Sequence, residues 1–373
     1  MARINLTGDG AAARIDWKGA LRHPAARFAV ATLVPVPLLM LGGVFGGVFL
    51  PLALLWVGLL CFIADEVARQ LGLHMGEVSD SGWADRLSVV IATAHFLLIP
   101  FALHALSGQA GLSVWGWLAA FFGFGLWFGQ VSNANAHELI HRRDARLHGL
   151  GVAVYVTLLF GHHASAHRHI HHRFVATPDD PNTAEAGEGF YAFALRAWAG
   201  SFRSGLDIER EISRRRGRLN PYVIYLGGAA AMLLAVALAF GPAGLLAWVM
   251  LSAHAQMQLL LSDYVQHYGL SRGRGAGGRY APVGPEHSWD APLPLSRLLM
   301  LNAPRHADHH AHPHRTYPDL RHPEGVPMLP HSLPAMATLA LIPPLWRQVM
   351  DPRVAKVQAR RKAAAARAVP SGS

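Results

Sequence analysis

Histidine dominates the chemistry available to this chain. The sequence holds 23 histidines but a single cysteine, Cys61. Nine of the histidines fall between Asn133 and His172, and seven fall between His306 and His331. Clustered imidazoles suit transition metals, whereas one thiol cannot build a disulfide framework, a cysteine-based zinc ribbon or an iron–sulfur centre. The clusters therefore predict a metal site with nitrogen or oxygen ligands.

Three groups within these clusters have the spacing of a helical chelate. They are His137 with His141, His167 with His171 and the adjacent His172, and His306 with His309 and His310. Residues three or four apart lie on one face of a helix, so each group is compatible with metal binding. A catalytic zinc uses about three protein ligands, and these groups supply more than that. Two metal ions are the more economical interpretation.

Two other interpretations of the histidines are weaker. The run from His137 to His141 also has the zinc protease pattern, in which Glu138 would be the general base. That function would leave the second and third groups without a role. A solvated, metal-buffering tract is the other alternative, but such a tract has no reason to repeat a four-residue spacing at the ends of apolar segments.

The remaining histidines near the clusters are interpreted as supporting or surface residues. They are His162, His163, His169, His312, His314, His322 and His331. Three more lie alone in apolar segments, at His95, His104 and His254. A lone imidazole in such a segment is more often packed and hydrogen-bonded than a ligand. None of these ten residues is predicted to bind metal.

The histidine groups lie at the ends of long apolar segments. The chain is 52% hydrophobic and only 15% charged, against about 25% charged residues in an average soluble domain. Lys and Arg are absent from residues 28–68, 87–141 and 219–271. A span needs roughly 20 apolar residues, so each interval has room for two. We expect an all-α integral membrane protein with six transmembrane helices in three hairpins, and disfavour a soluble helical protein with buried core helices.

Gly, Pro and polar residues mark the expected turns. The candidates are Gly46-Gly47 with Pro51, Ser107-Gly108-Gln109, and Gly241-Pro242. None contains Lys or Arg, so all basic residues fall on the opposite side of the membrane. The positive-inside rule assigns that side to the cytoplasm, together with both termini. The unbroken apolar interval after Arg27 is too long for the apolar region of a signal peptide, so we expect no cleaved targeting segment.

This topology predicts three regions along the chain. Residues 1–27 form a cytoplasmic N-terminal segment, residues 28–350 form the six-span domain, and residues 351–373 form a basic tail rich in Ala and Arg. The histidine-rich regions 132–218 and 272–330 of the six-span domain are cytoplasmic and carry the two-metal site. The tail has the composition of a solvated or membrane-surface helix end. Topology accounts for the net charge of +10, so we expect no nucleic-acid partner.

Four segments carry a specific resemblance. They are His137-Glu138-Leu139-Ile140-His141-Arg142, His167 to His172 leading into Val175-Ala176-Thr177-Pro178-Asp179-Asp180-Pro181, Gln266-His267-Tyr268-Gly269-Leu270, and Arg305-His306-Ala307-Asp308-His309-His310. In composition and order they resemble the signatures of the bacterial membrane-bound alkane 1-monooxygenases, a family within the membrane fatty acid desaturase/hydroxylase superfamily. The likeness runs from about His137 to Leu320, and Ala303-Pro304 before the last segment departs from it.

The resemblance implies a set of metal ligands and a metal. The set comprises His137, His141, His167, His171, His172, His267, His306, His309 and His310. In the family such ligands hold two non-haem Fe ions, although spacing alone leaves zinc, copper and nickel open. His267 enters on the resemblance alone. Glu138 and Asp308 adjoin ligands and are candidates to accept hydrogen bonds from imidazole N–H groups.

The resemblance also implies a reaction, its partners and a location. The reaction is hydroxylation of the terminal methyl group of a medium or long-chain n-alkane by O₂, with electrons from rubredoxin and its NAD(P)H-dependent reductase. The location is the bacterial inner membrane. A xylene-monooxygenase-like hydroxylase of aromatic methyl groups is the main alternative. A membrane fatty acyl desaturase fits less well, because the desaturase second box usually reads H-x-x-H-H and this chain has Arg168.

Overall fold

Residues 23–73, 81–274 and 277–368 are described by the structure, a computed structural model. These residues form helices, turns and loops without a β-strand, apart from isolated bridges. The all-α class expected from the sequence is confirmed. Of the predicted N-terminal segment 1–27, only residues 23–27 lie within the described part, and the first helix already begins at Pro24.

Five helical segments in the described residues are long and apolar enough to cross a membrane. They are Pro24–Phe45 (α2 Pro24–Leu33 and α3 Pro35–Phe45), Phe49–Gln70 (α4 Phe49–Leu55, η1 Trp56–Leu60 and α5 Cys61–Gln70), Ala84–Leu106 (α6), Val114–Ile140 (α7 Val114–Leu126, η2 Trp127–Ser132 and α8 Asn133–Ile140) and Tyr222–His267 (α13). Many large apolar side chains on them are exposed, including Leu52, Leu97 and Leu238. Such continuous apolar surface is unusual on a soluble protein, and the chain is a multi-pass membrane protein.

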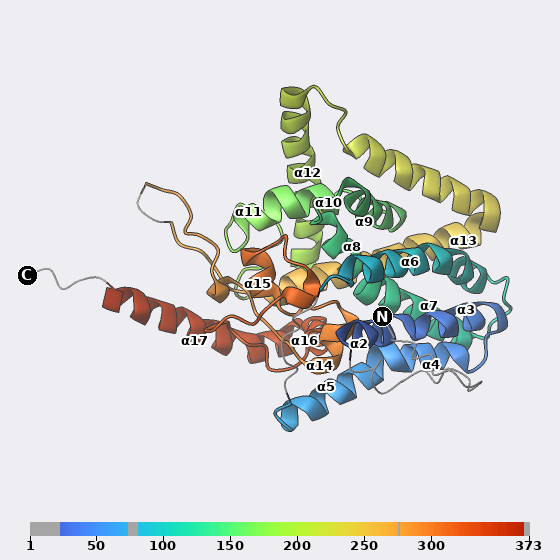
Figure 1. The fold of residues 1–373 in the computed structure, drawn as a ribbon, viewed down its shortest axis with the longest axis horizontal. Helices are drawn as coiled ribbons and strands as arrows, with labels where there is room; N and C mark the ends of the chain where they lie inside the picture. The colour runs from blue at the N-terminus through green and yellow to red at the C-terminus, as the bar shows by residue number, and fades with distance from the viewer. Residues whose placement is uncertain (1–22, 74–80, 275–276, 369–373) are drawn as a thin grey trace, which may run out of the picture.

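The 46-residue element α13 is two helical arms joined by a sharp reversal. Gly241 has φ 66° and ψ −167°, which is not helical. Glycine adopts a positive φ without a steric penalty, and Pro242 is well suited to begin the next helix. Figure 1 shows the chain doubling back at this point. The reversal therefore lies where the sequence predicted a turn.

The other two expected turns also lie where the sequence predicted them. Gly46 and Gly47, both with positive φ, separate α3 from α4. The segment 107–113 separates α6 from α7. All three reversals lie at one end of the helical bundle in Figure 1. The histidine-bearing helices lie toward the opposite end.

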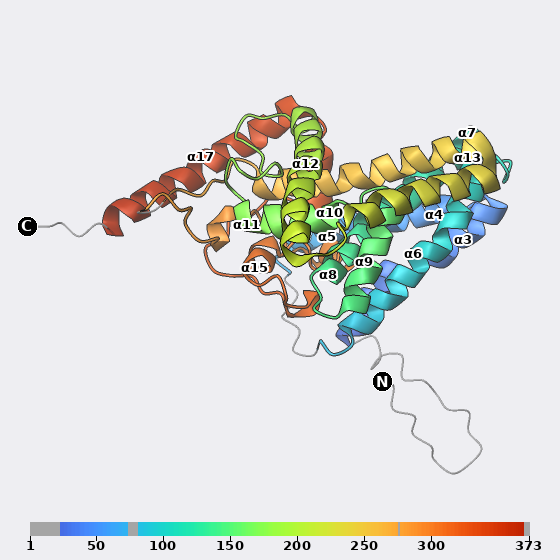
Figure 2. The same cartoon turned by 90° about the horizontal axis from the view of Figure 1, so that it is seen from above.

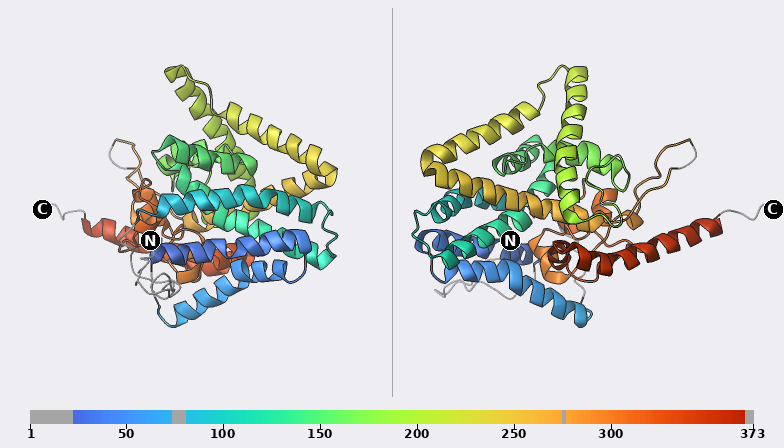
Figure 3. Two further views of the ribbon diagram at one scale, coloured as in Figure 1. Left: turned by 45° about the vertical axis from the view of Figure 1, so that its right-hand side comes forward. Right: turned by 180° about the vertical axis from the view of Figure 1, so that it is seen from behind.

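The remaining helices complete that opposite end. They are α9 Ala145–Thr157, α10 His163–Ala166, η3 His167–His171, α11 His172–Phe174, α12 Phe190–Arg216, η4 Pro285–His287, α14 Pro294–Leu299, α15 His306–Ala311, η5 Tyr317–Asp319, α16 Leu333–Ala340 and α17 Pro343–Ala368. Helices α12 and α17 project away from the bundle (Figures 1 and 2). The views in Figure 3 show the same separation between the apolar arms and the histidine-bearing elements.

Helix α17 runs across the predicted tail boundary at residue 350. Its first half is anchored by Trp346, Met350 and Val354, which are buried in a cluster with Tyr264 and Tyr268. Beyond these residues the helix carries exposed basic side chains. The end of the bundle and the basic tail are therefore parts of one continuous helix.

Candidate metal centre

All nine histidines predicted as ligands converge at the end of the bundle. They come from the end of α8, from η3 and α11, from the last residue of α13 and from α15. The first group of five contains His137, His141, His167, His172 and His309, and the second group of four contains His171, His267, His306 and His310. Within each group one ring nitrogen of every member lies within 4.8 Å of those of the others. We call these nine residues the histidine centre.

The spacing of the ring nitrogens suits two ligands of one metal ion. The Nε2–Nε2 distances are 2.7 Å for His137 and His167, 3.0 Å for His167 and His172, 3.1 Å for His172 and His309, 2.9 Å for His267 and His306, and 3.0 Å for His306 and His310. Metal–imidazole bonds of about 2.1 Å at a right angle separate two ligand nitrogens by about 3.0 Å. Each group could therefore surround one ion.

Burial makes the centre a poor place for free imidazoles. The Nε2 atoms of His141 and His171 are buried without a hydrogen-bond partner, which costs about 1–3 kcal/mol for a polar group. Burial, and then neighbouring histidines, holds the pKa of His309 and His310 well below its usual range. These imidazoles are therefore neutral, and a neutral imidazole is the form that binds metal. The donor set fits a nitrogen-ligated metal centre.

The type of helix decides which histidines share a group. The four-residue spacing of His167 and His171 suggested one chelate, but the two residues lie in different groups. Residues 167–171 form a π-helix, whose wider turn relates residues five apart. His167 therefore meets His172. The pairing inferred from an ordinary α-helix is wrong at this point.

Helix α15 contributes to both groups. His306 and His310, four residues apart, share the second group, as their spacing predicted. His309 lies in the first group, so the expected pairing of His306 with His309 is wrong. Consecutive helical residues point about 100° apart, and His309 and His310 therefore reach in different directions. The adjacent pair His171 and His172 is divided in the same way.

Two buried acceptors orient imidazoles of the second group. His171 Nδ1 is 2.8 Å from the Asp180 carboxylate, and His267 Nδ1 is 3.2 Å from the main-chain oxygen of His287. Burial alone would lower the pKa of His171, but Asp180 raises it above its ordinary value. Each Nδ1–H is thereby used as a donor, which directs the lone pair of Nε2 into the centre.

Asp180 is a functional residue that the sequence interpretation left without a role. It stands in the second signature, nine residues after His171, so the signal was present in the resemblance. Its carboxylate also accepts hydrogen bonds from the Thr183 hydroxyl (2.7 Å) and the Asn182 main-chain N–H (3.0 Å). Asn182 in turn donates to Asp263 at 2.6 Å. This buried network fixes the Asp180 carboxylate beside His171.

Glu138 and Asp308 make other contacts than the predicted hydrogen bonds to ligand imidazoles. The Glu138 carboxylate lies 3.1 Å from Arg142. Asp308 binds Arg315 at 2.6 Å and His312, which is outside the nine, at 2.9 Å. Guanidinium groups compete strongly for carboxylates, and both acids therefore brace the segments that carry the ligands.

Two of the supporting histidines touch the centre. The buried His163 ring lies 5.0 Å from the His167 ring, and His314 Nδ1 lies 3.1 Å from the main-chain oxygen of His141. By contrast, His95 hydrogen-bonds Ser132 and Thr157 inside the bundle. The packed role expected for His95 is confirmed.

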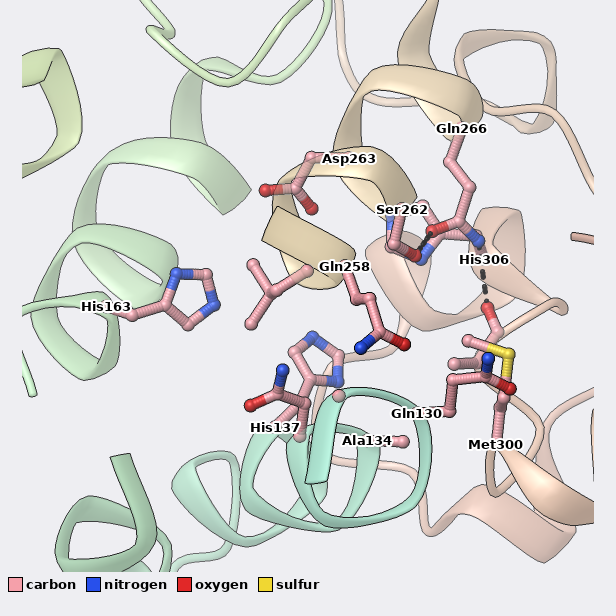
Figure 4. Close-up of a pocket in the computed structure, with 14 residues that line it drawn as sticks. Gln130, Ala134, His137, His163, Gln258, Ser262, Asp263, Gln266, Met300 and His306 are labelled. Carbon is pink, nitrogen blue, oxygen red and sulfur yellow. Dashed lines mark hydrogen bonds between the residues drawn. The ribbon is translucent and has the colours of Figure 1, made fainter. Parts of the chain in front are cut away.

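Two adjoining cavities open from the histidine centre into the bundle. The inner cavity is lined by His137, by His306 and by residues of α13 that include Gln258 and Ser262 (Figure 4). The outer cavity shares Gly129, Gln130, Gln258, Ser262 and Met300 with it. The walls of the outer cavity include Leu126, Leu261 and Leu341. An elongated apolar molecule could thus reach the centre.

Comparison with known proteins agrees with this combination of apolar helices and clustered histidines. Residues 112–339 match the family model described as fatty acid desaturase. An alkane 1-monooxygenase of Pseudomonas putida is 34% identical over 328 residues, covering 84% of this chain and 79% of the relative. Alkane 1-monooxygenase 1 of Alcanivorax borkumensis is 32% identical, covering 81% and 76%.

These matches identify the class of enzyme and the family to which the chain belongs. The match to the fatty acid desaturase family places the chain among the membrane desaturases and hydroxylases. The chain belongs to the alkane 1-monooxygenase family, and it is an oxidoreductase of the monooxygenase type. The hydroxylase component of xylene/toluene monooxygenase from Pseudomonas putida is a weaker relative, 29% identical over 57% of each chain. The family resemblance seen in the sequence is confirmed.

Proposed function

We propose that this enzyme hydroxylates the terminal methyl group of medium or long-chain n-alkanes, giving primary alcohols. The observation that carries the proposal is the histidine centre at the end of an apolar-walled pair of cavities. Relatives that cover more than four fifths of this chain are named as alkane 1-monooxygenases. Hydroxylation of aromatic methyl groups is the second candidate, supported by the weaker likeness to the xylene/toluene enzyme.

The proposed cofactor is a pair of non-haem iron ions, one in each histidine group. Iron would supply the redox chemistry that activates O₂. The division of the donors into five and four supports two separate ions. Asp180 orients His171, and the His287 carbonyl orients His267.

The substrate would lie along the two cavities with its terminal methyl group in the inner one. His137 and His306 are among the residues that line that cavity, so a methyl group bound there would lie beside the histidine centre. The apolar walls of the outer cavity would hold the rest of the chain and exclude water from the reacting end. Holding the methyl group in place is the main contribution of the protein here.

The proposed topology has six spans in three hairpins, with both termini and the histidine regions in the cytoplasm. The three reversals lie together at the end of the bundle away from the histidines (Figure 1). Their sequences lack Lys and Arg, whereas the segments at the other end are basic. That asymmetry supports an orientation in the bacterial inner membrane with the reversals outside.

The proposed electron donor is rubredoxin, supplied by its NAD(P)H-dependent reductase. Exposed basic residues of α17, including Arg353, Lys356 and Arg360, line an open surface depression near the histidine end. We expect the turnover rate at limiting rubredoxin to fall several-fold from low to physiological ionic strength, because salt screens the steering of an acidic carrier. Steady-state rates across a NaCl series test this, with saturating rubredoxin as the control. A flat response would remove the steering role of these charges.

Product analysis tests the function itself. Cells expressing the chain with rubredoxin and its reductase would be fed octane, hexadecane, xylene and a fatty acyl substrate, and the products separated by gas chromatography and mass spectrometry. We expect 1-octanol or 1-hexadecanol. A benzylic alcohol as the dominant product would favour the second candidate, and a new double bond would point to a desaturase. Cells expressing the His310→Ala variant provide the background.

A further inference from the structure

The second arm of α13 carries a stripe of polar residues to which the proposed reaction assigns no role. His254, Gln258, Ser262 and Gln266 follow one another at intervals of four residues, which places them on one helical face. Gln258, Ser262 and Gln266 line the inner cavity (Figure 4). His254, Gln258 and Ser262 line the outer one, and Gln266 directly precedes His267 in the sequence. An otherwise apolar arm thus presents polar groups to a passage that is suited to hydrocarbon.

The facing helix leaves space for this stripe. Gly125 and Gly129 are also four residues apart, on α7 and η2. A Cβ atom at Gly125 would overlap the His254 ring, and one at Gly129 would overlap the Gln258 amide. Any larger residue at these two positions would displace the polar side chains. The glycine pair and the polar pair therefore form a matched contact between the two helices.

Most hydrogen-bonding groups of the stripe have partners. The Ser262 hydroxyl donates to Gln266 Oε1 at 2.8 Å, and Gln266 Nε2 donates to the main-chain oxygen of Ala303 at 3.0 Å. Gln258 Nε2 donates to the main-chain oxygen of Gly125 at 2.9 Å. A carbonyl can only accept, so this bond fixes the orientation of the Gln258 amide.

Two side-chain amide oxygens beside the cavities have no donor. With the amide orientation fixed, the Oε1 atom of Gln258 is buried without a hydrogen-bond partner. The Oε1 atom of Gln130, on the facing helix, is also buried without a hydrogen-bond partner, and its side chain lines both cavities. A buried acceptor without a partner is costly and uncommon. The passage therefore offers hydrogen-bond acceptors to whatever moves through it.

An n-alkane cannot use these acceptors, because it has no polar hydrogen. The alcohol formed from it has both an alkyl chain, which suits the apolar walls, and a hydroxyl group, which can donate a hydrogen bond. Its alkyl chain matches Leu126, Leu261 and Leu341, and its hydroxyl is a donor of the kind that Gln258 Oε1 lacks. A water molecule could also donate to Gln258, but it would not use the apolar walls.

We infer that Gln258, together with Gln130, forms a hydroxyl-binding site for the alkan-1-ol product between the histidine centre and the outer cavity. The inference rests on the proposed function, which supplies the alcohol. The new hydroxyl forms beside His137 and His306 and moves to Gln258 Oε1 as the chain withdraws. The alcohol consequently binds in the same passage as the alkane and competes with it.

The test removes the acceptor while keeping the shape of the side chain. Methionine is unbranched and close in size to glutamine, so Gln258→Met deletes the acceptor with little change in volume. We expect the inhibition constant of 1-octanol against octane hydroxylation to rise about tenfold, the change that corresponds to loss of one hydrogen bond of about 1.4 kcal/mol. The inhibition constant of 1-chlorooctane, which cannot donate, should stay the same.

Gln256→Met is the matched control, because it makes the same change on the same helix. Gln256 is outside both cavity linings and uses its amide to bind Trp198 and the main-chain oxygen of Leu158. Its 1-octanol inhibition constant should match that of the wild-type enzyme. Gln130→Met, on the other helix, should weaken 1-octanol binding as Gln258→Met does, and it replaces that variant if the latter does not fold.

A binding measurement separates this inference from the proposed function. The rise in melting temperature that 1-octanol causes in purified protein in nanodiscs requires no turnover, and we expect it to shrink in both cavity variants. If the wild-type protein forms no 1-octanol from octane, the proposed function is contradicted. That holds even if 1-octanol raises the melting temperature of the wild-type protein and this effect is smaller in the variants. Equal binding of 1-octanol and 1-chlorooctane by the wild-type protein, or unchanged 1-octanol binding in both variants, would overturn the hydroxyl-binding site.

Discussion

Alanine at His309 and alanine at His310 are each expected to abolish hydroxylation and to remove one of two iron ions, but from different groups. The two residues are neighbours in sequence, yet His309 lies in the group of five and His310 in the group of four. Loss of one imidazole leaves each affected group with an incomplete ligand set. Because outer-sphere changes already cost about 10–100-fold, we expect direct loss of a ligand to reduce the rate more than a hundredfold.

Iron content and turnover measured on the same preparations decide the outcome. Each single variant should retain about half of the wild-type iron, and the double variant should retain almost none. His312→Ala is the matched control, since His312 follows in the same cluster but is exposed and binds Asp308. It should keep its iron. Full iron and full activity in His309→Ala or His310→Ala would contradict the ligand assignment, and tightly bound zinc with peptide cleavage would point to a protease.

His267 deserves a separate variant because no spacing pattern selected it. It is a lone histidine at the end of α13, and the family resemblance supplied it. Its Nε2 lies 2.9 Å from that of His306. The sequence could not supply this contact, because 39 residues separate the two histidines along the chain. Full activity in His267→Ala would restrict the second group to three histidines.

The apolar segments and their reversals were predictable because they follow from local properties of the chain. Lys and Arg are costly inside a bilayer, so their absence marks the spans. Gly241 and Pro242 each have a conformational preference that favours a reversal at their position. Both signals act over a few residues, and both predicted features are present.

The grouping of the histidines was not predictable in the same way. An ordinary helix was assumed for residues 167–171, but these residues form a π-helix, which is rare and was not indicated by the residue types. The polar stripe of α13 was also missed, since His254 alone reads as a packed residue. Its meaning depends on Gly125 and Gly129, which come from a distant part of the sequence. The grouping of the histidines and the role of the polar stripe therefore depend on contacts between segments that are far apart in the sequence.

Asn in place of Asp180 is expected to lower hydroxylation about 10- to 100-fold, the usual cost of losing an outer-sphere partner of a metal-bound histidine. The Asp180 carboxylate accepts hydrogen bonds from His171, Thr183 and the main-chain N–H of Asn182. An amide has only one acceptor oxygen, and its NH₂ group would face at least one of these donors. The NH₂ group would face either His171 and Thr183 or the main-chain N–H of Asn182. In either orientation the substitution removes the negative charge that holds the proton on His171 Nδ1 and so directs Nε2 into the centre.

Asp179→Asn is the control for Asp180→Asn, because it makes the same change at the neighbouring position, where the side chain is exposed. Turnover, iron content and melting temperature would be measured for both variants. We expect Asp180→Asn to lose iron on dialysis faster than the wild-type enzyme, whereas Asp179→Asn should match the wild type in all three. A loss of melting temperature in Asp180→Asn with normal iron retention and normal turnover would show that Asp180 only supports the fold. If Asp180 orients His171, the variant should lose iron while its melting temperature stays nearly unchanged. The fold of this loop does not depend on Asp180 alone, because Arg272 donates hydrogen bonds to the main-chain oxygens of Val175 and Arg173.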